Sequence, residues 1–166
     1  MAHGDDRAYA RAPRPEDVAR VCRALNAAGA RYVLIGGFAV IAHGAVRTTQ
    51  DIDLLIDDAP DNVRLVKGAL DVLADRAARE VRDEDVRTYM VVRIADEIVV
   101  DLMGQACGVR YEDAVADTET VEIEGVPVPI AGTATLIRTK QTDRASDIAD
   151  RQFLEALLRG RSSSSS

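Results

Sequence analysis

Two aspartates one residue apart, Asp51 and Asp53, carry the clearest chemical signal in the sequence. They open the apolar run 51–56, which is typical of a β-strand. Because side chains of a strand alternate between its two faces, both carboxylates are expected on one face and Ile52 on the other. Neighbouring carboxylates repel each other unless a cation lies between them, and hard divalent cations such as Mg²⁺ prefer oxygen ligands. The spacing therefore predicts a pair of metal ligands.

The alternative is a solvated acidic pair at a strand end, in a chain that is rich in acidic residues. Asp53 lies inside an apolar run, where an unpaired charge is costly. This position favours a functional pair over a solvated one.

A double glycine, Gly36-Gly37, lies upstream of the acidic pair and directly follows an apolar strand predicted over residues 31–35. Glycine has no side chain, so the backbone amides of such a turn can approach a phosphate group. A metal site beside a phosphate-binding turn is typical of enzymes that transfer phosphoryl or nucleotidyl groups.

The whole pattern resembles the nucleotidyltransferase (polymerase beta-like) superfamily, and within it the AbiEii-type and related bacterial nucleotidyltransferases. The matching residues are Gly36, Gly37, Ala39, His43, Gly44, Arg47, Thr49, Asp51 and Asp53. The resemblance implies a nucleoside triphosphate as substrate, two Mg²⁺ ions, and Arg47 and Thr49 as nucleotide-binding residues beside the glycines. We interpret His43 as a structural residue of a short helix, because the sequence shows no partner for it.

The superfamily also needs a third acidic residue on a neighbouring strand, and Asp101 is the one good candidate. It lies inside the apolar segment 98–103, where an aspartate needs a compensating charge. The alternative is a hydrated carboxylate at a strand end. We expect Asp101 to bind metal with Asp51 and Asp53 and to assist deprotonation of the acceptor.

A second group of charged residues lies near the C-terminus: Lys140, Arg144, Asp147 and Asp150. The last three share one face of a predicted helix, so the simple interpretation is a solvent-facing helix with ion pairs. The resemblance instead implies that Lys140 and Arg144 bind the triphosphate and that Asp147 orients one of them.

Composition restricts the remaining possibilities. The chain has 166 residues, of which 47% are hydrophobic, and a formal net charge of −7. An acidic chain does not attract polyanions non-specifically, so no broad nucleic-acid-binding surface is expected. No signal peptide or membrane span is apparent, and Cys22 and Cys107 are expected to be buried, reduced thiols of a cytoplasmic protein.

The order of predicted elements indicates an α+β fold, in which helices cover a small mixed β-sheet, as the nucleotidyltransferase fold also requires. We expect one domain over residues 15–160, flanked by a disordered N-terminus, 1–14, and a disordered serine tail, 161–166. The predicted helices are 15–28, 37–43, 60–78, 133–140 and 146–158, and the predicted strands are 31–35, 51–56, 88–95, 98–103, 119–123 and 126–130, with a loop over 79–87.

The leading hypothesis is a metal-dependent nucleotidyltransferase, in which Asp51, Asp53 and Asp101 hold metal ions that clamp a nucleoside triphosphate. The acceptor hydroxyl is open between a small molecule, a protein and a tRNA end, and the resemblance suggests a toxin–antitoxin or defence setting. The alternative is a non-catalytic module of the same fold that binds a nucleotide or a protein partner.

Overall fold

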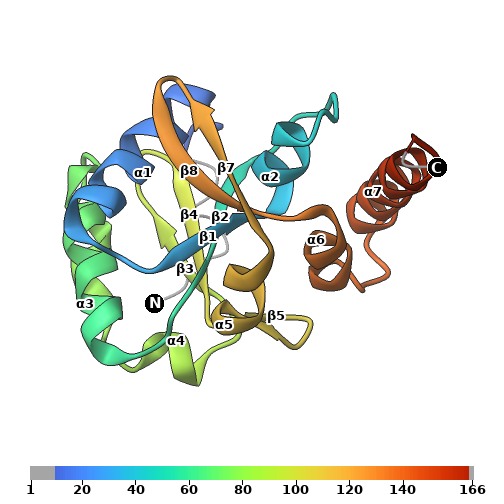
Figure 1. Cartoon of the computed structure of the whole chain (residues 1–166). Helices are drawn as coiled ribbons and strands as arrows, with labels where there is room; N and C mark the ends of the chain where they lie inside the picture. Colours follow the sequence, from blue (N-terminus) through green and yellow to red (C-terminus); the bar gives the residue numbers. More distant parts are fainter. Residues whose placement is uncertain (1–9, 165–166) are drawn as a thin grey trace.

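The computed structural model describes residues 10–164, and residues 1–9 and 165–166 lie outside this description. Six strands form one mixed sheet in the order β3-β4-β2-β1-β8-β7 (Figure 1). Helices lie on both sides of this sheet, so the predicted α+β class is confirmed. The strands are β1 Tyr32–Ile35, β2 Asp51–Ile56, β3 Val92–Ala95, β4 Val99–Met103, β7 Thr118–Ile123 and β8 Val126–Ala131.

The helices divide between the two sides of the molecule. Figure 1 shows α1 and α3 together on one side, with α6 and α7 on the far side. A small separate ladder, β5 Gln105–Ala106 with β6 Val109–Arg110, lies beside the main sheet. The helices are α1 Pro15–Ala28, α2 Gly36–Ala42, α3 Pro60–Ala69, α4 Asp85–Thr88, α5 Tyr111–Ala114, α6 Thr133–Thr139 and α7 Ala145–Ser164, with 3₁₀ turns η2 Leu70–Val72, η3 Ala77–Glu80 and η4 Val115–Asp117.

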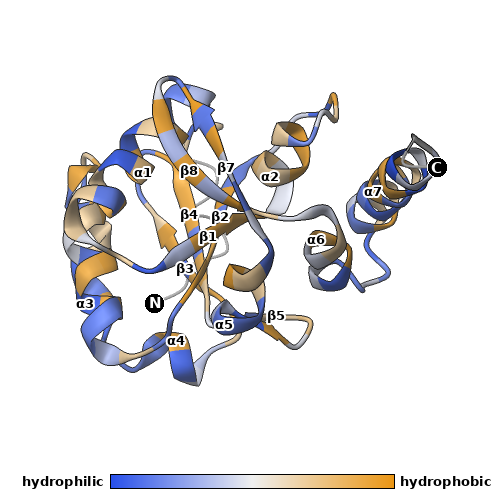
Figure 2. Ribbon diagram, viewed as in Figure 1, coloured by the Kyte–Doolittle hydropathy of each residue, from blue (hydrophilic) through white to orange (hydrophobic). Residues whose placement is uncertain are grey.

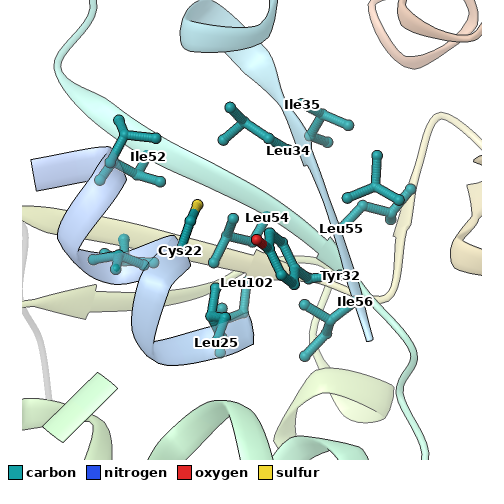
Figure 3. Packing of buried hydrophobic residues seen from close by; sticks show 14 of the residues in the cluster. Cys22, Leu25, Tyr32, Leu34, Ile35, Ile52, Leu54, Leu55, Ile56 and Leu102 are labelled. Atoms are coloured by element: carbon teal, nitrogen blue, oxygen red, sulfur yellow. The ribbon is translucent and has the colours of Figure 1, made fainter. Parts of the chain in front are cut away.

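The hydrophobic core lies between the sheet and the helices α1 and α3. Ile52 and Leu54 of β2 are fully buried near Cys22 and Leu25 of α1 (Figure 3). The central strands are correspondingly apolar over most of their length (Figure 2). The alternation predicted for β2 is confirmed. Ile52 and Leu54 face the core, whereas Asp51 and Asp53 lie together on the other face of the strand.

The long helix predicted over 60–78 is wrong in its second half, because α3 ends at Ala69 and a 3₁₀ turn follows. The carboxylate of Asp96, in the β3–β4 turn, accepts hydrogen bonds from the backbone N–H groups of Asp75 and Ala77. Glu97 accepts one from Ala74. These contacts satisfy the amides that a longer helix would have paired internally.

The strand predicted over 88–95 is shorter than expected. The segment before it forms the short helix α4, and β3 begins at Val92, which pairs with Leu102 of β4. Tyr89, Met90 and Val91 are exposed. The partner strand β4 ends at Met103, so Tyr89 and Met90 have no facing strand to extend the ladder.

Several expectations for the termini and the cysteines need correction. Arg11 is held by hydrogen bonds of 2.6 and 2.7 Å to Asp17, so the disorder predicted for residues 1–14 does not extend to this position. The helix α7 runs to Ser164, into the predicted serine tail. Both cysteines are free and Cys22 is buried, but Cys107 is exposed in the β5–β6 turn, where it has a φ of 48°. Within residues 10–164, no helix is long and apolar enough to cross a membrane.

Candidate active site

The three aspartates singled out from the sequence lie together. The parallel pairing of β2 with β4 places Asp53 directly opposite Asp101. Each of Asp51, Asp53 and Asp101 offers a carboxylate oxygen within 4.8 Å of the other two. The cluster arises from strand register alone, because Asp51 and Asp53 share a face of β2 and Asp101 faces the same way on β4.

This arrangement raises the pKa of Asp53. Burial raises its pKa to about 7, and the neighbouring carboxylates of Asp101 and Asp51 act in the same direction. Lys140 and Arg93 oppose the shift. Without a bound cation, Asp53 therefore keeps its proton to a higher pH than an ordinary aspartate does.

Arg93 is the main residue of the site that the sequence analysis did not identify. It lies opposite Asp101 in the antiparallel β3–β4 pair and donates two hydrogen bonds of 2.9 Å to the two oxygens of that carboxylate. A second contact of 3.5 Å joins its guanidinium to Asp51. Arg93 thus supplies one fixed positive charge to the acidic cluster.

The donor set of the cluster fits a hard divalent cation. All three ligand groups are carboxylates, and their oxygens are close enough to contact one ion together. Burial raises the pKa of Asp53 most, and the neighbouring carboxylates raise it further, so a bound cation would favour the ionised form of this residue. Among residues 10–164, Asp51, Asp53 and Asp101 are therefore a group that could hold a hard divalent cation.

The glycines Gly36 and Gly37 lie at the start of α2, directly beside the acidic cluster. Gly36 has a φ of 74°, and a Cβ placed there would lie 2.0 Å from Oδ2 of Asp53. A Cβ on Gly37 would lie 2.5 Å from Oγ1 of Thr49 and 3.3 Å from Nη2 of Arg47. Both glycines therefore have a packing role that the sequence analysis did not include: they leave room for the side chains of neighbouring site residues.

A polar cavity of about 190 Å³ opens next to the aspartates. It is lined by part of the acidic cluster, the loop between α2 and β2, the end of α6 and the first turns of α7. Nearly all the residues singled out for nucleotide binding contribute to it. The lining residues are Gly37, Arg47, Thr48, Thr49, Gln50, Asp51, Asp53, Lys140, Arg144, Ser146, Asp147 and Asp150.

Lys140 is a buried residue of the cavity wall and has 6% of its surface exposed. Its ammonium group lies 3.0 Å from Asp150 and 3.7 Å from Asp147. The predicted solvent-facing helix with ion pairs is therefore wrong for Lys140 and Asp150, which are both buried. Arg144, in contrast, is exposed at the start of α7.

His43 has a structural environment, as interpreted from the sequence. Its side chain is buried, and its Nε2 lies 2.9 Å from the backbone oxygen of Ala131 in β8. The other ring nitrogen lies 3.6 Å from Glu119. These contacts connect the end of α2 to the sheet and leave His43 out of the cavity lining.

Comparison with solved structures supports the fold. The chain is similar to a crystal structure described as a "putative nucleotidyltransferase (TM1012)" from Thermotoga maritima, with a TM-score of 0.55 and 14% sequence identity. The match covers 90% of this chain and 97% of that one. No curated protein matches the chain.

The family comparison covers the complete cluster of site residues. The model of a family described as "Nucleotidyl transferase of unknown function (DUF2204)" matches residues 14–160. This range includes the glycine turn, all three aspartates, Arg93 and the C-terminal charged residues. The chain therefore belongs to this nucleotidyl transferase family and has the α+β fold of a nucleotidyltransferase.

Proposed function

We propose that this chain transfers a nucleoside monophosphate from a nucleoside triphosphate to an acceptor hydroxyl. The observation that carries the proposal is the meeting of Asp51, Asp53 and Asp101 on adjacent strands. In the reaction, a bond forms between the acceptor oxygen and the α-phosphorus, and the bond from that phosphorus to pyrophosphate breaks. The acceptor proton passes to a carboxylate and then to solvent.

In this proposal the three aspartates hold Mg²⁺, with two ions expected. Bound Mg²⁺ supplies positive charge that stabilises the transferring phosphoryl group and the leaving pyrophosphate. Arg47, Lys140 and Arg144 line the adjacent cavity, where their positive charges suit phosphate oxygens. Thr49 and the two glycines shape the wall between the cavity and the acidic cluster.

Asp101 is the proposed proton acceptor for the acceptor hydroxyl. Its two oxygens each accept one hydrogen bond from Arg93, which leaves a further acceptor site on each oxygen. Arg93 therefore belongs to the proposed machinery, as the group that orients the Asp101 carboxylate and favours its ionised form.

The proposal also includes the class of acceptor and the biological setting. The sequence resemblance to AbiEii-type proteins suggests a protein side chain or a tRNA end, in a toxin–antitoxin or defence system. The net charge of −7 makes tRNA the less favoured of these. A small-molecule hydroxyl is the third candidate.

The decisive experiment follows the position of a radioactive phosphorus. The protein is incubated with Mg²⁺, a cell lysate and each of the four nucleoside triphosphates, labelled at either the α or the γ phosphate. Nucleotidyl transfer predicts that, above the labelling of lysate alone, the protein adds only the α label to an acceptor, and that the Asp53→Asn variant adds none. Protein-dependent transfer of the γ label instead would make the chain a phosphotransferase and overturn the proposal.

A second candidate function, a non-catalytic nucleotide-binding module, is favoured by one observation. Arg93 already neutralises part of the acidic cluster without a metal ion. Thermal stability distinguishes the two functions. A binding module of this kind is stabilised equally by triphosphate with and without Mg²⁺, whereas the transferase is stabilised more when both are present.

A further inference from the structure

We propose that Asp150 is a positioning residue that fixes Arg47 and Lys140 at the edge of the candidate active site. This inference rests on the proposed function, because it assigns both cations to the triphosphate. Asp150 itself belongs to α7, and its role is to hold two cations that come from other parts of the chain.

One oxygen of Asp150 carries both contacts. Its Oδ2 lies 2.5 Å from Nη1 of Arg47 and 3.0 Å from Nζ of Lys140. Arg47 comes from the loop between α2 and β2, and Lys140 follows α6. A single carboxylate therefore joins the loop before β2 to two neighbouring segments near the C-terminus, 103 residues from Arg47 in the case of Asp150 itself.

Burial makes this junction rigid. Asp150 is 4% exposed and Lys140 is 6% exposed, so neither charge is stabilised mainly by water. Separating Lys140 from Asp150 would leave its buried ammonium group with only the 3.7 Å contact to Asp147, which restricts how far the lysine side chain can move. Arg47 is further held by a hydrogen bond of 3.0 Å from its Nε to the backbone oxygen of Thr48.

The junction holds its two cations in place beside the metal-binding aspartates. Asp150 is shared by Arg47 and Lys140, and Asp147 lies 3.7 Å from Lys140, so the charges of these four residues balance while both cations stay fixed at the wall of the cavity. Cations that are already ordered lose less conformational entropy when phosphate binds. Arg144 lines the same cavity but is exposed and does not contact Asp150, so it lacks this ordering.

The test measures binding of inorganic tripolyphosphate in the presence of Mg²⁺, by calorimetry on folded protein well below its melting temperature. Tripolyphosphate reports on phosphate recognition without requiring knowledge of the base or the acceptor. We expect Asp150→Asn, which keeps the shape but removes the charge, to raise the dissociation constant at least fivefold. Glu155→Gln removes one charge from an exposed position on the same helix and is expected to leave binding within twofold of wild type.

Coupling between sites separates positioning from a purely structural role. If Asp150 acts through Arg47, then Arg47→Gln weakens binding much less in the Asp150→Asn background than in wild type. Asp150→Glu keeps the charge and is expected to weaken binding less than Asp150→Asn does. It also serves as the test variant if the Asn protein does not fold, with a dissociation constant at least twofold above wild type expected.

Two results would overturn the inference. One is a dissociation constant within twofold of wild type in a folded Asp150 variant, and the other is full additivity of the Arg47 and Asp150 changes. If wild type binds neither tripolyphosphate nor any nucleoside triphosphate, the proposed function fails and this inference fails with it. If wild type binds and the Asp150 variants bind equally well, only the positioning role is lost.

Discussion

Arg93 and Asp101 face each other across the β3–β4 pair, and the guanidinium donates a hydrogen bond of 2.9 Å to each carboxylate oxygen. Asp101 is thus both a member of the acidic cluster and the partner of a fixed cation. A metal ion that binds this cluster must share Asp101 with Arg93 or displace it. The strength of the Arg93–Asp101 pair therefore helps to set the affinity for metal.

Replacing Arg93 with Gln is expected to tighten Mg²⁺ binding. The change removes a positive charge 3.5 Å from Asp51 and frees both oxygens of Asp101. Charge-assisted hydrogen bonds are worth about 1.5–3 kcal/mol, and the partly exposed Arg93 is at the low end of this range. A dissociation constant for Mg²⁺ about tenfold lower is expected by calorimetry.

Arg79→Gln is a matched control for this change. Arg79 pairs with Asp71 on the exposed surface, away from the acidic cluster, so its removal should leave Mg²⁺ affinity unchanged. If Arg93→Gln binds Mg²⁺ as weakly as wild type, Arg93 does not compete with the metal.

The sequence predicted that the three aspartates would come together, but it did not predict Arg93. The missing information is strand register. A tight turn at Asp96-Glu97 would place Arg93 opposite Val100, whereas the observed pairing of Ala95 with Val99 places it opposite Asp101. A one-residue slip reverses the face of every side chain, and the hydrophobic pattern of this short hairpin does not fix the turn.

The fold was predicted best where local patterns and tertiary contacts agree. Two elements marked by glycines are present as predicted. Gly29, with positive φ, ends the helix α1, and Gly125, also with positive φ, lies in the turn of the β7–β8 hairpin. The end of α3 was missed because it depends on Asp96, which is distant in sequence. The burial of Lys140 was missed for a similar reason, since it requires α7 to fold back onto α6.

Asp53 makes the stability of the metal-free protein depend on pH. Its pKa is about 7 in the folded protein and about 3.9 when unfolded, so the folded state holds an extra proton between these values. The free energy of unfolding therefore includes a favourable contribution from this proton, which is complete below about pH 4 and is lost as the pH rises through 7. Asp53→Asn should therefore gain in melting temperature over wild type as the pH increases from 5 to about 8 in a chelating buffer.

Asp17 provides a control of opposite sign. Hydrogen bonds from Arg11 lower its pKa to about 2, so its stabilising contribution is complete above about pH 4. Asp17→Asn should be less stable than wild type by a constant margin over the same pH range. A constant margin for Asp53→Asn as well would contradict the raised pKa of Asp53.

Replacing Gly37 is expected to lower the stability of the folded protein, in addition to any effect on nucleotide binding. A Cβ at this position would lie 2.5 Å from Oγ1 and 2.7 Å from Cβ of Thr49, so Gly37→Ala forces overpacking that costs roughly 1–3 kcal/mol. Thr49→Gly in the same chain should restore part of this loss, which a urea-unfolding double-mutant cycle measures. Additive losses would show that Thr49 is not the obstacle.

A second glycine tests whether the effect is specific to the site. No atom lies within 4 Å of the Cβ position at Gly68 in α3, and its φ is not positive. Gly68→Ala should be neutral or should stabilise the protein by about 0.5–1 kcal/mol, since alanine is the better helix former.

Replacing Lys140 with Met separates the charge of this residue from the packing of its side chain. Methionine keeps an apolar stem in the cavity wall but leaves Asp147 without the ammonium group and Asp150 with Arg47 alone. Stability should fall by about 1–3 kcal/mol, because Arg47 still compensates Asp150. Triphosphate binding in Mg²⁺ should weaken by about 1.5–3 kcal/mol, the range of a charge-assisted hydrogen bond, and monophosphate binding should weaken less.

Arg144→Met is the natural comparison for Lys140→Met. Arg144 lines the same cavity but is exposed, so its loss should change stability by no more than about 0.5 kcal/mol. Both dissociation constants are measured with the same non-hydrolysable triphosphate, and both stabilities by urea unfolding. A Lys140→Met protein that is destabilised but binds triphosphate as wild type does would make Lys140 a structural counter-ion of Asp150. In that case Arg47 and Arg144 would be the cations left in the cavity to contact the phosphates.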